Sequence, residues 1–325
     1  MDAHHRSRRP GISRDSPVAQ RDQRRSETWA VQSRAEARRR SDGRRVRGEA
    51  RHAKASNRDQ ALTAKLTHPN TVTIYDYGRT PEGLFYYAME LLSGATLTQV
   101  VDAGGPQPVE RVVRILRDAA LALNEAHDIG LIHRDIKPSN IMLARQGGVP
   151  DVTKVLDFGL VKNLGKVDDL DQTNTMSIKG TPHYLSPEAI QDPQGIDART
   201  DLYALGAVGY YLLAGRHVFE GKTIMEICLH HLHTKPLPLA EVCAQDVPAE
   251  LDKLIVCCLE KSQSDRPASC QEFADALDQL EVARWTRANA EAWWNRFGSD
   301  IESAKEPLSP NVTDPTVAID FDERG

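Results

Sequence analysis

The chain has 325 residues, of which 40% are apolar and 27% are charged, and its formal net charge at pH 7 is -5. These values lie close to the average of soluble globular proteins, so they argue against a fibrous or a membrane-embedded class. The length allows one large domain or two domains of ordinary size.

The first 58 residues differ from the rest of the chain. They contain 16 Arg and one Lys against seven acidic residues, a net charge of +10, so the remainder carries -15. The first leucine is Leu62. So few apolar residues cannot bury enough surface to offset a backbone entropy cost of roughly 1 to 2 kcal/mol per residue. The segment is therefore expected to be disordered.

A short helix and a hairpin are predicted next. Leu62–Leu66 fits the end of a helix that stops before Pro69, because the residue before a proline is pushed out of the α region. The runs Thr71–Tyr75 and Leu84–Met89 are β-branched and aromatic, and a turn with two glycines separates them. We expect these two runs to pair as a β-hairpin.

Helices dominate the middle of the chain. From Pro108 onward the apolar residues recur at helical spacing, which predicts an amphipathic helix ending near Gly130. Two short strands, 141–143 and 153–156, are predicted around a turn at Gly147-Gly148. Further helices are predicted at about 200–214, 222–233, 248–260 and 270–283. Strands followed by helices indicate the α+β class with a mainly helical lobe.

No segment is predicted to cross a membrane. The longest apolar run, Leu202–Ala214, has 13 residues, whereas a membrane-spanning helix needs about 20, so a buried core helix explains it better. The five cysteines lie late in the chain, show no paired C-x-x-C spacing and follow no secretory signal. We expect reduced thiols and a cytoplasmic location.

The last forty residues are predicted to be peripheral. Residues 283–297 fit an amphipathic helix that carries Trp285, Trp293 and Trp294. Residues 305–315 read as a linker and residues 316–321 as a short strand-like tail. Docking of the Trp-bearing helix on the main body is the favoured interpretation, and a tail that binds a partner is the alternative.

Two motifs carry the chemistry of the chain. His133-Arg134-Asp135-Ile136-Lys137-Pro138-Ser139-Asn140 is followed, 22 residues after Asp135, by Asp157-Phe158-Gly159. These segments resemble the catalytic loop and the magnesium motif of protein kinases, and the segment Gly180–Glu188 resembles the end of their activation segment. The lysine two residues after Asp135 is similar to that of the eukaryotic-like, or bacterial Hanks-type, serine/threonine kinases.

The resemblance implies a kinase-like fold and a reaction, the magnesium-dependent transfer of the ATP γ-phosphoryl group to Ser or Thr of proteins. Asp135 would accept the proton of the acceptor hydroxyl, and Lys137 would place a cation on the γ-phosphate. Asn140 and Asp157 would offer oxygen ligands to Mg²⁺. Thr181 is expected to be a catalytic residue together with Asp135 and Lys137.

The resemblance also assigns residues around this centre. Met89, Glu90 and Leu91 resemble the hinge that binds adenine, and Met142 is expected to line the same nucleotide pocket. The residues expected to hold or regulate the site are Arg134, Phe158, Glu188, Asp201 and Arg266, with His133 and Phe158 stacked and Glu188 and Arg266 forming a buried ion pair.

Thr173 and Thr175 are the expected phosphorylation sites of the activation segment. Their spacing from Thr181 is similar to that of bacterial receptor-type kinases that phosphorylate themselves. Arg134 would then bind the new phosphate, because a guanidinium suits paired phosphate oxygens. Protein substrates are therefore the expected partners, together with self-association for phosphorylation between copies. The alternative is an exposed polar loop without modification.

The resemblance is incomplete ahead of residue 59. A kinase carries a G-x-G-x-x-G loop over the phosphates and a lysine in a V-A-I-K-like strand, and neither is present here. Asp59 stands where the family has an ion-pair Glu. We therefore expect a basic segment at 1–58, a remnant of the N-terminal lobe at 59–92, a C-terminal lobe at 93–282, and a helix with a tail at 283–325.

Three interpretations of this departure stay open. The favoured one is that the Arg-, Ala-, Ser- and Gly-rich residues 1–58 are DNA translated out of frame. The second is that the chain is a pseudokinase or scaffold that binds partners through its helical lobe. A truncated N-terminal lobe is expected to make phosphoryl transfer weak or absent, which fits this second interpretation. The third is a basic arm that binds nucleic acid. No aromatic stacking pattern supports the third, so nucleic acid is not an expected partner.

Overall fold

In a computed structural model of the chain, the structure describes residues 62–79, 85–158, 182–192 and 194–304. The segments predicted to be disordered at 1–58, and to be a linker and tail after 305, lie outside these residues. Of the described residues, 78–79 and 85–86 belong to one compact unit, and all the others belong to a second. Every helix and every candidate site residue described below belongs to the second unit.

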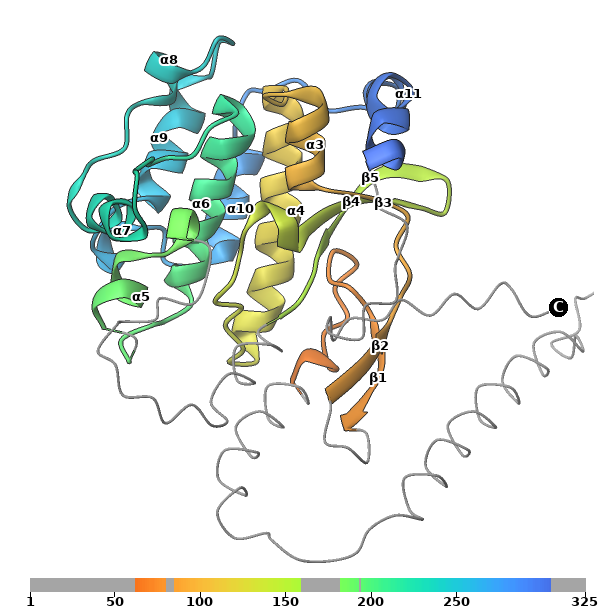
Figure 1. The fold of residues 1–325 in the computed structure, drawn as a ribbon, viewed down its shortest axis with the longest axis horizontal. Coiled ribbons are helices and arrows are strands. Elements are labelled where there is room, and N and C mark those ends of the chain that lie inside the picture. Colours follow the sequence, from red (N-terminus) through yellow and green to blue (C-terminus); the bar gives the residue numbers. More distant parts are fainter. Residues whose placement is uncertain (1–61, 80–84, 159–181, 193, 305–325) are drawn as a thin grey trace, which may run out of the picture. The chain divides into compact units, whose positions relative to one another are not determined.

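The strands form two small sheets (Figure 1). β1 (Ile74–Arg79) pairs with β2 (Phe85–Met89), and β3 (Gly94–Thr96), β4 (Ile141–Gln146) and β5 (Val149–Val155) form a second sheet in that order. All pairings in the second sheet are antiparallel. The predicted strands around Gly147-Gly148 are confirmed, and both glycines have a positive φ, which the tight turn between β4 and β5 requires.

The first strand of the predicted hairpin begins three residues later than expected. The backbone of Asn70 and Val72 is bonded to Val155 of β5, with N–O distances of 2.7 and 3.0 Å, and Thr71 forms a parallel bridge to the same residue. The Asn70 side chain donates a further hydrogen bond to the carbonyl of Thr153. Residues 70–72, which precede β1, are therefore attached to β5.

The helices predicted from residue 108 onward are present in the predicted order, and three helices that were not predicted occur as well, at Leu97–Gly104, Pro187–Gln191 and Leu239–Val242 (Figure 1). The helices of the described residues are α3 (Leu97–Gly104), α4 (Val109–Asp128), α5 (Pro187–Gln191), α6 (Arg199–Ala214), α7 (Ile224–His233), α8 (Leu239–Val242), α9 (Ala249–Cys258), α10 (Cys270–Asp278) and α11 (Arg287–Ala304), with short 3-10 turns η1 (Pro138–Asn140), η2 (Pro182–Tyr184) and η3 (Gln263–Asp265). The α+β class is confirmed.

The helix α6 is the centre of the core. Every residue from Thr200 to Leu213 is buried, as predicted for the long apolar run. Gly206 and Gly209 let neighbouring helices approach, because a Cβ at these positions would lie 2.6 Å from the Cβ of Cys258 and 2.8 Å from a methyl group of Leu116. Among the described helices, none combines the length and the apolarity that crossing a bilayer requires.

Several predicted helix ends are wrong, including that of α10, which ends at Asp278 rather than at residue 283, and capping explains two of the helix starts. α7 begins at Ile224 rather than at residue 222, since the Thr223 side chain caps the helix by accepting from the backbone N–H of Glu226. The C-terminal helix begins at Arg287, where the side chain of Asn289 accepts from the backbone of Thr286, and continues to Ala304. It contacts α3 and β5, which confirms that it docks on the main body.

Candidate active site

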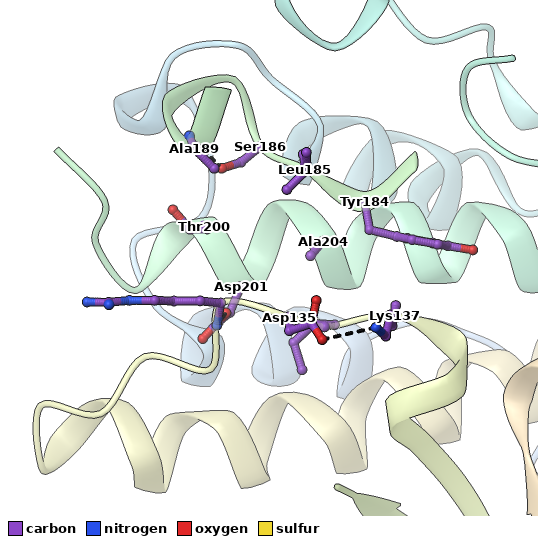
Figure 2. A pocket seen from close by; sticks show the side chains of 11 residues that line it. Asp135, Lys137, Tyr184, Leu185, Ser186, Ala189, Thr200, Asp201 and Ala204 are labelled. Carbon is purple, nitrogen blue, oxygen red and sulfur yellow. Dashed lines mark hydrogen bonds and ion pairs between the residues drawn. The ribbon is translucent and has the colours of Figure 1, made fainter. Parts of the chain in front are cut away.

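The loop between α4 and β4 gathers three of the predicted site residues. The ammonium group of Lys137 lies 3.0 Å from a carboxylate oxygen of Asp135 (Figure 2). The side-chain amide of Asn140 donates to the same carboxylate over 3.1 Å and to the backbone carbonyl of Asp135 over 2.8 Å. Asn140 ends the turn η1 and is buried, whereas Asp135 and Lys137 stay partly exposed. The Asp135 carboxylate is thus held in place but remains accessible.

Asp201, near the start of α6, fixes the backbone of this loop. Its two carboxylate oxygens accept from the backbone N–H groups of His133 and Arg134, each over 2.8 Å, and one of them lies 2.7 Å from Nε2 of His127. Burial alone would raise the pKa of Asp201, but these hydrogen bonds outweigh it and the pKa is lowered. Arg134 has a φ of 63°, and a non-glycine residue keeps that conformation only where its surroundings hold it.

The backbone before Asp157 is bonded to the same loop. The N–H of Leu156 donates to the carbonyl of Asn140 over 2.9 Å, and the carbonyl of Leu156 lies 2.7 Å from Nε2 of His133. Asp157 itself has a φ of 54°. Burial lowers the pKa of His133, while the charges of Asp201, Asp135 and Asp157 act in the opposite direction. The buried imidazole of His133 thus contacts the backbone N–H of Asp135 through Nδ1, over 3.3 Å, and the carbonyl directly before Asp157 through Nε2.

Phe158 packs directly on this imidazole. The ring centroids of His133 and Phe158 are 4.7 Å apart, and both side chains are completely buried. The predicted contact between the two rings is therefore present. It joins the segment that follows β5 to the loop that carries Asp135.

A pocket opens beside Asp135 and Lys137 (Figure 2). One wall is the loop Arg134–Lys137, the opposite wall is the segment Tyr184–Ser186 with Ala189, and Thr200, Asp201 and Ala204 of α6 form the floor. Figure 2 shows the Asp135 carboxylate on the side of the pocket that faces Lys137. The lining of the pocket therefore includes both a carboxylate and an ammonium group.

The predicted hinge leads from β2 toward β3. Met89 ends β2, Glu90 is half-buried, and Leu91 is 72% exposed. The Glu90 carboxylate accepts from the buried Lys154 ammonium over 2.7 Å and from the backbone of Thr73 over 2.9 Å. Burial raises the pKa of Glu90, but these bonds outweigh it and the pKa lies below its usual value.

Lys154 connects the hinge to the segment of Asp157, because it lies on β5 three residues before that carboxylate. Met142, the fourth predicted nucleotide-binding residue, lies on β4 opposite Lys154 and Thr96 and is partly buried. The pair of Glu90 and Lys154 is a contact that the sequence did not predict. A lysine directly before the apolar residues Val155 and Leu156 is the signal that could have pointed to it.

Glu188 and Arg266 form the expected ion pair. The guanidinium binds both carboxylate oxygens at 2.7 Å, and both side chains are buried. The hydroxyl of Thr200 donates to the same carboxylate. Burial acts to raise the pKa of Glu188, but the bonds from Arg266 outweigh it, so its pKa is lowered. This pair connects the start of α5 to the segment before α10.

Some predicted residues lie outside the described part of the chain. Thr181 and the two phosphorylation sites Thr173 and Thr175 belong to residues 159–181, so their positions stay predictions. His127, by contrast, is a described contact that was not predicted, although a second histidine six residues before His133 was a visible signal.

An aromatic cluster of His183, Tyr184 and His217 predicts that the stability of the fold depends on pH. His217 stacks on His183 with ring centroids 3.8 Å apart, and the Tyr184 hydroxyl lies 3.2 Å from its Nδ1. Burial and the neighbouring His183 lower the pKa of His217 to about 4. A histidine with a lowered pKa in the folded state opposes folding when it is protonated.

The free energy of unfolding should therefore fall as the pH drops from about 6.5, the ordinary value, toward 4. In His217→Phe the ring remains but cannot be protonated, so this fall should be smaller. Chemical denaturation at several pH values checks this. An unchanged slope in the variant would show that other groups account for it.

Comparisons with known proteins agree with this geometry. The model of the protein kinase domain family matches residues 22–277, so the chain belongs to that family. The match begins inside the basic segment 1–58, although those residues lack the glycine-rich loop and the strand lysine. The predicted boundaries at 58, 92 and 282 stay predictions.

Curated relatives are bacterial serine/threonine kinases. The chain is 38% identical to serine/threonine-protein kinase pkn3 of Myxococcus xanthus over 247 residues, which cover 75% of this chain and 44% of that protein. It is 33% identical to PknB of Mycobacterium tuberculosis over 269 residues, 82% of this chain and 42% of that protein. The chain thus spans less than half the length of these relatives.

A solved structure gives the same classification. The kinase domain of PknI from Mycobacterium tuberculosis has a TM-score of 0.54 and 26% sequence identity to this chain, covering 71% of this chain and 80% of that one. The protein-kinase-like fold that the two motifs predicted is therefore confirmed. Kinases of this family in general use ATP and a divalent metal ion.

Proposed function

We propose that the chain is a serine/threonine protein kinase that transfers the γ-phosphoryl group of ATP to Ser or Thr side chains of proteins. The observation that carries this proposal is the arrangement of four side chains on and beside one loop. Asp135 is held between Lys137 and Asn140, and Asp157 follows directly on Leu156, whose backbone is bonded to the same loop.

Asn140 and Asp157 are suited to hold a magnesium ion. Mg²⁺ prefers oxygen ligands, and both residues offer side-chain oxygens. The amide nitrogen of Asn140 donates to Asp135, which leaves the amide oxygen as the end that can ligate a cation. Bound by these two residues, the ion would supply positive charge that neutralises the charge developing on the transferred phosphoryl group.

Asp135 and Lys137 would act on the acceptor and the phosphate. The partly exposed carboxylate of Asp135 borders the pocket, so it can orient a hydroxyl group and accept its proton. The ammonium group of Lys137 lies 3.0 Å from Asp135, and a rotation of its side chain would bring this positive charge to the γ-phosphoryl group. In this proposal the pocket between the loop and Tyr184–Ser186 receives the acceptor segment, and Thr181, the residue before η2 in the chain, takes part in catalysis.

We propose the activation segment as the first substrate, with phosphorylation of Thr173 and Thr175 by a second copy of the chain. Arg134 would then bind the phosphate, because its backbone is fixed by Asp201 at the edge of the pocket. We also propose a cytoplasmic location, since all five cysteines are free thiols and the reaction consumes ATP.

The rate is expected to be low. The sequence lacks the loop that covers the phosphates, and the loss of one preorganised charge contact costs about 100- to 1,000-fold in rate. The experiment is to incubate the purified chain with ATP, with and without Mg²⁺, and to map phosphorylated residues by mass spectrometry. Mg²⁺-dependent phospho-Ser or phospho-Thr is the expected result. Nucleotide or partner binding without any transfer would favour the pseudokinase or scaffold instead.

A further inference from the structure

A buried polar cluster joins α11 to the strand that leads to Asp157. The Asp151 carboxylate, at the start of β5, accepts two hydrogen bonds of 2.9 Å from the Arg111 guanidinium of α4. It also accepts from the indole N–H groups of Trp285 and Trp294, over 2.8 and 2.6 Å. Arg111 is fully buried and Asp151 nearly so. Asp151 has a φ of 56°, so the surrounding contacts also hold its backbone.

Aromatic rings complete the enclosure of this ion pair. The Arg111 guanidinium lies 4.1 Å from the ring centroid of Trp293 and 5.2 Å from that of Trp285, within the range of cation–π attraction. A buried charge is tolerated only when its partners satisfy it, so the tryptophans of the C-terminal segment are part of what keeps this pair in place. We call Arg111, Asp151, Trp285, Trp293 and Trp294 the tryptophan clamp.

The clamp also reaches α3. A Cβ at Gly104, the last residue of α3, would lie only 2.9 Å from the indole of Trp293. Glycine at this position therefore allows the helix end to rest directly on the tryptophan. Through Trp293 and Asp151, the C-terminal helix contacts both α3 and β5 (Figure 1).

These two elements adjoin the proposed nucleotide site in the chain. β5 presents Lys154 to Glu90 of the hinge at 2.7 Å and ends two residues before Asp157. α3 follows the hinge after the three residues of β3, which pair with β4 at Met142. A shift of either element would move the hinge relative to Asp157.

We propose that α11, acting through the tryptophan clamp, is a positioning element for nucleotide binding. The clamp touches no nucleotide in this proposal. It fixes β5 and α3, and through them the hinge and Asp157. The inference rests on the proposed function. It predicts that the segment after the C-terminal lobe, from residue 283 onward, is required for full nucleotide affinity.

The test uses the full chain with the double substitution Trp285→Phe and Trp294→Phe, which keeps the aromatic packing but removes both hydrogen bonds to Asp151. The KM for ATP and the dissociation constant for Mg-ADP should rise about 5-fold or more, while kcat at saturating ATP changes less than about 2-fold. Two controls separate positioning from general destabilisation. Arg287→Ala removes an exposed pair on α11, and Ile255→Val weakens the core at α9. Both should leave the KM unchanged.

Hydrogen exchange without nucleotide provides a readout that is independent of catalysis. In the double variant, exchange should accelerate in peptides covering 87–97 and 149–157 and stay unchanged in α7. Unchanged exchange and unchanged KM in a folded variant would overturn the inference. Failure of the parent chain to bind nucleotide would overturn the proposed function instead, and faster exchange at 87–97 would still support the clamp.

Coupling between two sites is reciprocal, so the nucleotide should also affect the clamp. Three of the four tryptophans of the chain belong to the clamp, and the fourth is Trp29. In a Trp29→Phe background, Mg-ADP should therefore change the tryptophan emission. A saturating titration that leaves the emission unchanged, in a chain that binds Mg-ADP by calorimetry, would contradict the coupling.

Discussion

Replacing Asp135 with Asn is expected to lower the rate of phosphoryl transfer by about 100- to 10,000-fold, the usual contribution of a general base. The amide has nearly the shape of the carboxylate but cannot accept the proton of the acceptor hydroxyl. The second hydrogen bond from Asn140, to the backbone carbonyl of residue 135, does not depend on the carboxylate and should persist. The loop should therefore keep its conformation.

Rates of phosphorylation in single-turnover assays, together with the dissociation constant of Mg-ADP, measure this effect. The dissociation constant should stay within about 3-fold, since Asp135 borders the acceptor pocket. Asp300→Asn, on the exposed side of α11, is the matched control and should keep full activity. If the Asp135 variant retained more than about a tenth of the parent rate, Asp135 would not be the base.

Arg266→Ala is expected to destabilise the fold by about 3 to 5 kcal/mol. The arginine satisfies both oxygens of Glu188 and also donates to the backbone carbonyls of Glu260, Arg199 and Lys261. Removing it leaves a buried carboxylate without its countercharge. The lowered pKa of Glu188 means that this carboxylate is charged at neutral pH.

Denaturant unfolding at pH 7 measures this loss. The matched control is Arg287→Ala, which breaks an exposed pair with Glu291 and should cost less than about 0.5 kcal/mol. The difference between the parent and Arg266→Ala should shrink as the pH falls from 4.5, the ordinary pKa of Glu188, through the lower folded value, because protonation removes the buried charge. A loss below about 1 kcal/mol at pH 7 would contradict the role assigned to the pair.

Motifs predicted the centre of the candidate site because its residues are close in sequence. The loop from His133 to Asn140 carries most of the donors and acceptors that build it, and Asp157 follows a strand that apolar residues make visible. Short segments were harder to recognise. The elements that were missed are β3, α3, α5 and α8, because three, eight, five and four residues show too little periodicity.

The long-range polar contacts could not be predicted. The pair of Glu90 and Lys154 joins residues 64 positions apart, and Trp294 binds an aspartate 143 positions away. Neither hydropathy nor local propensity encodes such distances. The sequence did favour a docked Trp-bearing helix, but it contained no sign that Arg111 and Asp151 would receive it.

The central claim is that Asn140 and Asp157 hold a metal ion at a nucleotide beside Asp135. The most direct test is titration of the parent chain and of Asp157→Asn with ADP, with and without Mg²⁺. Mg²⁺ should tighten nucleotide binding to the parent about 10-fold or more, and this gain should be lost in Asp157→Asn, since the amide lacks the charge that favours a divalent cation. The same gain in both proteins would contradict the claim.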